Sequence, residues 1–232
     1  YDDGHTGIFS HNSLNSFQKI YDVSSHKIKE KSFDIVITNP PFGTKGKVTD
    51  KNILDDFEMG HKWKKDEDKW KKLSKIAAED GKGGQVPDIL FIERCLRFLR
   101  DDGRMAIVLP DGDLTNSSLG YVRQWIRDNA RILAVISLPQ ETFIPYGAGV
   151  KASVLFLQKL SKKELDTLKK KAYPSFMGSI EKIGYDIRGR AIYKRNEKGE
   201  IIKTDDKPAI DEDINLIIEE FKKFKEKNKM EF

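Results

Sequence analysis

The 232-residue sequence contains a single cysteine, Cys95, so it cannot form an internal disulfide and suits a reducing compartment such as the cytosol. Cys95 lies in an apolar helical pattern, which favours a small core residue over a nucleophile. The four histidines lack the spacing of metal ligands, so we expect no metal site. No apolar run approaches the ~18 residues of a membrane span, so we expect no membrane association.

The sequence also lacks an initiator methionine and a basic-then-apolar leader. Its opening residues read as the end of a strand already in progress, so we expect a chain cut from something longer. The length suits one domain with an appendage. The net charge of +5 is compatible with a nucleic-acid partner but does not require one.

A short apolar stretch that ends in two prolines is the most informative part of the sequence. Residues 33–37 are rich in β-branched side chains and predict a fully buried strand. Pro40 and Pro41 cannot donate to a sheet ladder, so Asn39 must lie at the carboxyl end of the strand, where open α/β sheets bind ligands. The Asn39 side-chain oxygen and the Pro40 carbonyl suit a planar substrate with an –NH2 group, whose ring Phe42 would cover.

After this strand the sequence alternates between helix and strand patterns, which predicts an α/β fold with a mostly parallel sheet. The last two strands are joined by a loop without a helical pattern, so the last strand should be reversed, at one side of the sheet, and form an antiparallel hairpin. The predicted elements are a helix from Pro87 that Gly103 ends, a strand at 104–109, a helix capped by Asn116 or Ser117, and strands at 132–138 and 152–157.

Residues 44–86 form a long polar insertion. Trp63 and Trp70 are seven residues apart and would share one face of a helix. Two interpretations are open: the tryptophans pack onto the body while the nearby lysines stay in water, which we favour, or both contact nucleic acid. The glycines at 81–84 predict a flexible joint rather than a phosphate loop.

We divide the chain into a catalytic domain, residues 1–160, and an α+β extension, residues 161–232. The final helix of the extension carries an apolar stripe, which we expect to dock on the sheet. Contact with another chain or with a missing N-terminal part is the alternative. The other predicted elements of the extension are a helix opened by the capping box Ser161–Glu164, a strand at 176–180, a hairpin with its turn at 196–199, and Asp211 as the cap of the final helix.

Several stretches, in order along the chain, resemble the modification (M) subunit of type I restriction-modification systems, an adenine-specific DNA methyltransferase. The stretch Asn39–Phe42 resembles the Asn-Pro-Pro-(Tyr/Phe/Trp) motif of amino-group methyltransferases that use S-adenosylmethionine. The resemblance implies a Rossmann-like methyltransferase sheet and methyl transfer to N6 of a flipped-out adenine. The other similar stretches are residues 1–6, 91–96, 103–112, 136–143, 147–154 and 183–189.

The resemblance also implies roles for individual residues. Asn39, Pro40, Pro41 and Phe42 form the catalytic motif. Phe42 and Phe143 would stack on the two faces of the target base, although loop packing is the alternative for Phe143. The implied cofactor-binding residues are Asn39, Asn12 and Phe91, and core packing is equally expected for Phe91. Lysines at 45, 47 and 151 would contact DNA phosphates or simply be solvent-exposed surface residues. The implied partners are DNA, a specificity subunit and a restriction subunit.

Two features depart from the family pattern. Asn12 occupies the place of an acidic residue that contacts the cofactor, and residues 1–32 contain no strand with a glycine-rich cofactor loop. We therefore expect an incomplete sheet that lacks its first two strands and exposes the motif strand as an unpaired edge. An inactive fragment and self-association through this edge are the expected consequences.

Two alternative functions remain. Methyltransferases that act on ribosomal RNA or on glutamine side chains also use Asn-Pro-Pro motifs, although residues 138–154 and the extension argue against them. A non-catalytic module that holds a specificity subunit is the alternative from another class.

Overall fold

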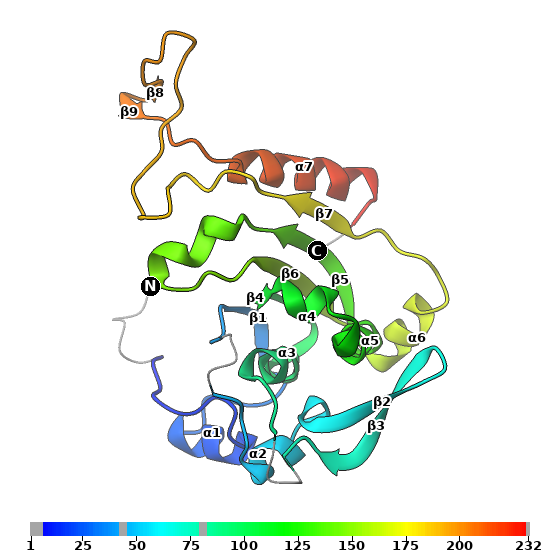
Figure 1. Cartoon of the computed structure of the whole chain (residues 1–232). Helices are drawn as coiled ribbons and strands as arrows, with labels where there is room; N and C mark the ends of the chain where they lie inside the picture. Colours follow the sequence, from blue (N-terminus) through cyan, green and yellow to red (C-terminus); the bar gives the residue numbers. More distant parts are fainter. Residues whose placement is uncertain (1–6, 42–45, 79–82, 231–232) are drawn as a thin grey trace.

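A five-stranded sheet forms the centre of the protein (Figure 1). The structure is a computed structural model and describes residues 7–41, 46–78 and 83–230. The order of the strands across the sheet is β1-β4-β6-β5-β7. These strands are β1 (Phe33–Thr38), β4 (Leu99–Pro110), β5 (Ala130–Ser137), β6 (Ala152–Lys159) and β7 (Phe176–Ser179).

The sheet is mostly parallel, with one reversed strand. β1 pairs in parallel with β4, and β5 with β7, whereas β6 is antiparallel to both β4 and β5. This confirms the predicted α/β class and the antiparallel β5–β6 hairpin. The expected position of the reversed strand at one side of the sheet is wrong. β6 lies inside the sheet, between β4 and β5, because it hydrogen-bonds on both of its edges.

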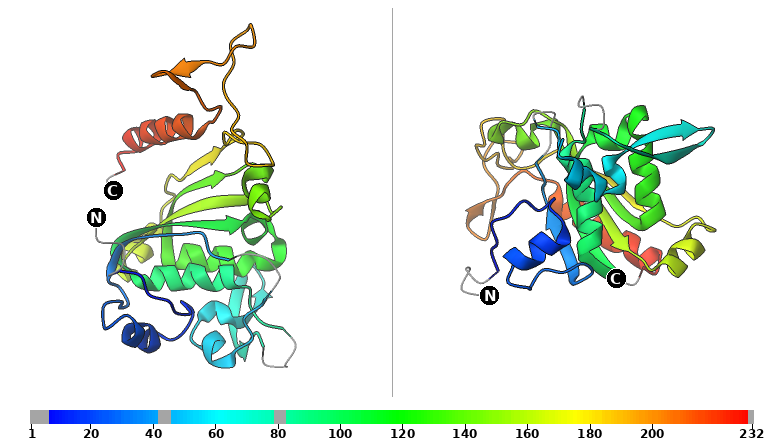
Figure 2. Two further views of the ribbon diagram at one scale, coloured as in Figure 1. Left: turned by 90° about the vertical axis from the view of Figure 1, so that its left-hand side faces the viewer. Right: turned by 90° about the horizontal axis from the view of Figure 1, so that it is seen from below.

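Helices α3 (Pro87–Phe98) and α5 (Gly120–Asn129) cover one face of the sheet (Figure 2). Their apolar sides meet the inward side chains of β4 and β6 in the main core. α3 ends at Phe98 rather than near Gly103, because Leu99 is already extended and lies opposite Phe33 in the β1–β4 ladder. The core residues of these helices include Ile89, Ile92, Cys95, Leu96, Val122, Trp125 and Ile126.

Helix α7 (Ile214–Lys227) covers only part of the opposite face. Its Ile217 and Phe221 pack against the β5 side chains Ala134 and Ile136, and the ring of Phe221 lies 5.4 Å from that of Phe176 on β7. Docking of the final helix on the sheet is thereby confirmed. The helix begins at Ile214 after Asp213, rather than directly after the predicted cap, since residues 210–212 still make extended bridges.

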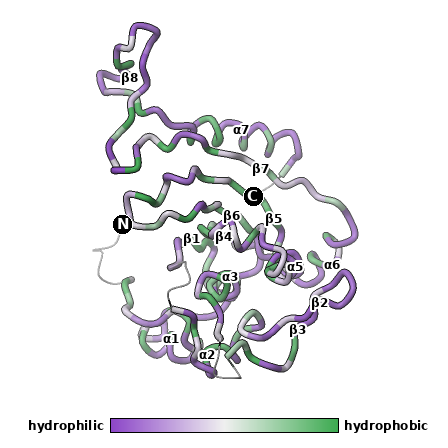
Figure 3. Tube along the Cα trace, viewed as in Figure 1, coloured by the Kyte–Doolittle hydropathy of each residue, from purple (hydrophilic) through white to green (hydrophobic). Residues whose placement is uncertain are grey.

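The β1 end of this face is open. Ile35 and Ile37 are 54% and 79% exposed, so the prediction of a fully buried strand is wrong. The reason is topological: β1 is the edge of the described sheet, with β4 on one side only. Figure 3 shows the apolar stretch of β1 in the hydropathy colouring. The expected exposed edge is therefore present.

The insertion forms a β-hairpin, β2 (His61–Asp66) and β3 (Lys69–Ile76), so the predicted helix is wrong. Alternation decides the structure here: each tryptophan faces a lysine across the hairpin, and both tryptophans lie on one face. Trp63 stacks on Tyr121 of α5 at 5.6 Å, and Trp70 meets the same ring edge-on. Packing of the tryptophans on the body, the favoured interpretation, is confirmed.

Shorter elements complete the chain. The predicted capping box is confirmed, since Ser161 pairs reciprocally with Glu164. Near the N-terminus, Ser16 caps α1. Residues 7–9 form no strand, and the turn at 196–199 is flanked by a single bridge rather than a regular ladder. The remaining elements are α1 (Phe17–Val23), α2 (Lys51–Asp55), η1 (Glu58–Gly60), α4 (Asp111–Thr115), η2 (Ser117–Leu119), η3 (Gln140–Tyr146), α6 (Lys162–Leu168), β8 (Lys203–Thr204) and β9 (Lys207–Pro208).

Candidate active site

The carboxyl ends of β1, β4 and β5 meet at one edge of the sheet, because these strands are parallel to one another. Asn39 follows β1, Asp111 follows β4 and Pro139 follows β5, while β6 begins at the same edge after Lys151. β1, β4 and β5 each end within two residues of a proline. In open α/β sheets this edge binds ligands.

The Asn-Pro-Pro motif lies at this edge. The β1–β4 register ends with Thr38 opposite Ile107, so Asn39 and Pro40 follow beside the last residues of β4. Pro40 is buried, which fixes the backbone, while Asn39 is exposed and its side chain is accessible to a ligand. Phe42 lies outside the described residues, so its predicted stacking role stays a prediction.

The connection between β5 and β6 forms a tied loop at the same edge. It contains η3, and Gln140 donates from Nε2 to the Gly149 carbonyl at 2.6 Å, which closes its base. Tyr185 of the extension donates from its hydroxyl to the Thr142 carbonyl at 2.8 Å. Phe143 is half-buried in this loop. The structure therefore brings the predicted stacking residue to the motif edge, on a restrained segment.

A polar cluster at this edge was not anticipated. Ser153 donates from Oγ to Asp111 Oδ1 at 2.7 Å, and Lys151 Nζ lies 3.9 Å from the other carboxylate oxygen. Lys151 thus has a carboxylate partner, which weakens the expectation that it meets a phosphate. The sequence did contain a signal for Asp111. Like Asn39, it is a polar residue beside a proline, directly after an apolar strand.

Two buried carboxyl groups lie near each other, one of them on the same short helix as Asp111. Asp113 of α4 and Asp88 at the start of α3 are 6% and 2% exposed. Asp113 Oδ2 has no hydrogen-bond partner among the described residues. Burial raises the pKa of the Asp113 carboxyl to about 7, and the nearby negative charge of Asp88 adds to the shift. The sequence analysis did not identify Asp113 and Asp88 as a buried pair, since each aspartate is an ordinary residue for the first turn of a helix.

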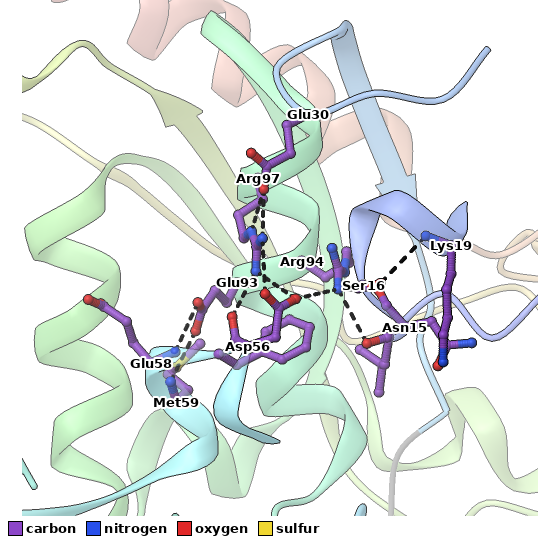
Figure 4. A network of polar contacts seen from close by, with 12 residues as sticks. Asn15, Ser16, Lys19, Glu30, Asp56, Glu58, Met59, Glu93, Arg94 and Arg97 are labelled. Carbon is purple, nitrogen blue, oxygen red and sulfur yellow. Dashed lines mark hydrogen bonds and ion pairs between the residues drawn. The ribbon is translucent and has the colours of Figure 1, made fainter. Parts of the chain in front are cut away.

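The Asn12 segment is held to α3 by a buried arginine (Figure 4). Arg94 donates from Nη2 to the carbonyls of Leu14 and Asn15, at 3.3 and 2.7 Å. Its guanidinium carbon lies 4.2 Å from the ring centroid of Phe17, so the rest of the group meets an aromatic face. Burial lowers the pKa of Arg94 to about 10, which still leaves it charged at neutral pH.

Asn12 itself forms a turn, with its Oδ1 accepting from the Leu14 amide at 3.0 Å. Glu93, beside Arg94, accepts from the amides of Glu58 and Met59 at 3.0 Å each (Figure 4). α3 therefore anchors one loop on each side. The sequence signal for these anchors was the adjacent charged pair Glu93 and Arg94 within an apolar helix. Its role is clear only in the structure, where α3 is buried along most of its length.

Phe91 of α3 is half-buried and packs against both the main core and a second apolar cluster around Leu54 and Phe57. Core packing, one of its two expected roles, is thus observed. Cys95 is buried in the main core, and burial raises the pKa of its thiol to about 12, as expected for a structural residue.

The described residues do not fit a complete S-adenosylmethionine site. Within residues 7–32 they form a turn and α1, and no strand carries a glycine-rich loop into a helix. Among all the residues that the structure describes, no group of three His, Cys, Asp or Glu side chains could hold a metal ion. In the described ranges, no helix is long and apolar enough to cross a membrane.

Comparison with known proteins places this edge in context. The type I restriction enzyme EcoEI methylase subunit of Escherichia coli is 26% identical over 132 residues, which are 56% of this chain and 22% of that protein. The chain therefore matches about a fifth of the length of this curated relative.

Solved structures show weaker likeness. A putative class I S-adenosylmethionine-dependent methyltransferase from Listeria monocytogenes is 20% identical over 68% of this chain and 43% of its own, with a TM-score of 0.45. A type I restriction-modification methyltransferase subunit from Streptococcus thermophilus is 21% identical over 82% of this chain and 32% of its own, with a TM-score of 0.43.

One match spans almost the whole sequence. The family model described as N-6 DNA Methylase matches residues 2–232. The matched range includes the Asn-Pro-Pro edge, the β5–β6 loop and the extension. The chain belongs to the N-6 DNA methylase family.

Proposed function

We propose that this chain forms the target-base half of the active site of an adenine N6 DNA methyltransferase of the type I modification-subunit kind. The observation that carries the proposal is the position of Asn39 and Pro40 at the carboxyl end of β1, with an exposed asparagine side chain beside a buried proline. The methyl donor is S-adenosylmethionine, whose site needs more than the described residues.

The chemistry follows from the two acceptors. Asn39 Oδ1 and the Pro40 carbonyl accept hydrogen bonds from the two amine hydrogens of adenine. Adenine normally delocalises its amine lone pair into the ring; these two bonds favour a tetrahedral nitrogen whose lone pair is available for attack. Both groups sit on backbone fixed by strand and proline, so positioning and preorganised polarity supply much of the catalysis.

The target base must first leave the duplex, since its amine is otherwise paired. The Phe143 loop lies at the same edge and is restrained by the Gln140 and Tyr185 hydrogen bonds. We assign Phe143 to stacking on one face of the flipped adenine and Phe42 to stacking on the other. A restrained loop favours this role, because little conformational entropy is lost when the base arrives.

The test is Asn39→Ala in a methyl-transfer assay with labelled S-adenosylmethionine and unmethylated duplex DNA. The chain is assayed alone and complemented with a segment that carries a glycine-rich cofactor loop. Loss of transfer by roughly 100-fold or more is expected, because the variant removes one of the preorganised acceptors. Asn52→Ala, an exposed asparagine of α2, is the control and should retain transfer. Equal transfer by Asn39→Ala and the control would refute the assignment.

We further propose that the chain works in a complex with DNA, a specificity subunit and a restriction subunit, in keeping with the type I subunits it is similar to. The exposed β1 edge provides a second contact. Its free ladder groups and the exposed Ile35 and Ile37 favour pairing with another strand, including a second copy of this chain.

A further inference from the structure

The β2–β3 hairpin is fixed rigidly to the body. Gln124 of α5 binds the Trp70 backbone in both directions, accepting from its amide at 2.7 Å and donating to its carbonyl at 2.8 Å. Gly120 allows this approach, because a Cβ there would lie 2.6 Å from the Trp70 ring nitrogen. Together with the contacts of Trp63 and Trp70 to Tyr121, these bonds fix which face of the hairpin points outward.

The outward face is lined with lysines. Lys64, Lys69, Lys71 and Lys75 all lie on the face opposite the tryptophans, and all four are exposed. In the register of the hairpin the one acidic residue on this face is Asp66, whose carboxylate is 2.5 Å from Lys71 Nζ. The face therefore carries a net positive charge of about three.

Two of these lysines are directly opposed. Lys64 pairs with Lys71 across the ladder, and a like-charge pair in this position destabilises a hairpin. Lysines two apart on a strand are about 7 Å from each other, and cross-strand neighbours about 5 Å. The repulsion within such a closely spaced array of charges is relieved when a polyanion with regularly spaced charges binds to it.

The hairpin adjoins the active-site edge. A pocket of about 590 Å³ lies between the polar cluster of this edge and the tryptophan face of the hairpin, lined by Lys65 and Trp70 of the hairpin, Arg123 of α5, and Asp111 and Ser153. A molecule large enough to reach the Asn39 edge and extend beyond it would pass along this side of the body. Lysine is suited to contact phosphates as a point charge, without reading bases.

We propose that the outward lysine face of the β2–β3 hairpin binds the phosphodiester backbone of duplex DNA and holds the substrate next to the active-site edge. This inference rests on the proposed function for the identity of the polyanion. It differs from a mixed aromatic and basic surface, because the tryptophans face the body and lysines predominate on the outward face.

The test measures binding of a dye-labelled duplex to the chain by fluorescence anisotropy over a range of salt concentrations, without methyl donor. In Lys64→Gln/Lys71→Gln, affinity should fall roughly tenfold or more at about 0.1 M salt, and the slope of log affinity against log salt should flatten by about 1.8. The matched control is Lys198→Gln/Lys203→Gln, on the protruding arm at the far end of the molecule (Figure 1). It should leave the slope unchanged.

Three results would overturn the proposal. The first is no DNA binding by the wild-type chain at about 50 mM salt, and the second is a loss of DNA affinity in the control variant equal to that in the hairpin variant. The third is a loss of poly-glutamate binding in the hairpin variant equal to its loss of DNA binding, which would indicate an acidic protein partner. Lys69→Gln/Lys75→Gln, on the same face, is a second variant in case the first does not fold. The readout is independent of catalysis. A hairpin-dependent slope, together with equal methyl transfer by Asn39→Ala and its control in the complemented assay, would refute the proposed function and leave the lysine-face proposal intact.

Discussion

The buried carboxyl of Asp113 makes a specific prediction about stability. Asp113 is 6% exposed, one of its oxygens has no partner in the described part of the chain, and Asp88 lies nearby. The folded protein therefore keeps the Asp113 proton up to a pKa of about 7, whereas the unfolded chain loses it near the ordinary value of 3.8. Replacing the carboxyl by an amide, Asp113→Asn, removes this difference.

The sign follows from proton linkage. Between about pH 4 and pH 7 the folded state binds more protons than the unfolded state, so the free energy of unfolding falls as pH rises. A shift of about three pKa units corresponds to about 4 kcal/mol, as an upper limit, lost by pH 8. Asp113→Asn should thus be close to the wild type at about pH 3.5, below the ordinary pKa of 3.8, and more stable at pH 8, less the cost of an unpaired amide group.

The assay is urea unfolding followed by tryptophan fluorescence at the two pH values. Glu93 has a raised pKa and Asp186 a lowered one, so the absolute pH dependence is mixed and the difference between wild type and variant is the informative quantity. Asp205→Asn, at the exposed β8–β9 turn, is the control. If Asp113→Asn and the control changed equally between the two pH values, the reasoning about the buried pair would be refuted.

Two further predictions concern the anchored loop and the open edge. Arg94→Met should destabilise the fold by about 3 kcal/mol, because two backbone carbonyls lose a charged donor; Arg100→Met, which breaks an exposed ion pair with Asp34, should cost less than about 1 kcal/mol by the same urea assay. Ile37→Lys should lower any concentration-dependent mass in sedimentation without loss of stability, since the side chain is 79% exposed; a wild-type chain that stays monomeric would contradict pairing through β1.

The sequence predicted the sheet and the motif edge well, because both depend on local signals. Prolines after apolar runs marked where β1 and β5 end, and the 3.6-residue spacing of Ile89, Ile92 and Leu96 marked α3. The helix predicted for Trp63 and Trp70 is wrong, because these residues form a hairpin. A spacing of seven fits one helix face, but across a turn the same two residues also share one face of a hairpin, and the lysine-rich context did not distinguish the two.

What could not be predicted depends on contacts between distant segments. The β-branched residues of β1 read as a buried strand, yet burial requires neighbours, and β1 has only β4 beside it in the described sheet. Arg94 is in the middle of an apolar helix, and only the carbonyls of Leu14 and Asn15, about eighty residues earlier, explain it. The Asp111–Ser153 bond likewise joins the residue after β4 to β6, two strands that become neighbours only in the folded sheet.

The position of β6 between β4 and β5 also bears on the order of events during synthesis. β4 ends at Pro110 and its second neighbour begins at Ala152, so about 40 residues separate them. At the usual synthesis rate of ~5–20 residues per second, one edge of β4 stays unpaired for roughly 2 to 8 seconds before β6 is synthesised. The sheet therefore closes late and through distant pairings, which slows folding and makes the nascent chain dependent on protection of that edge until β6 arrives.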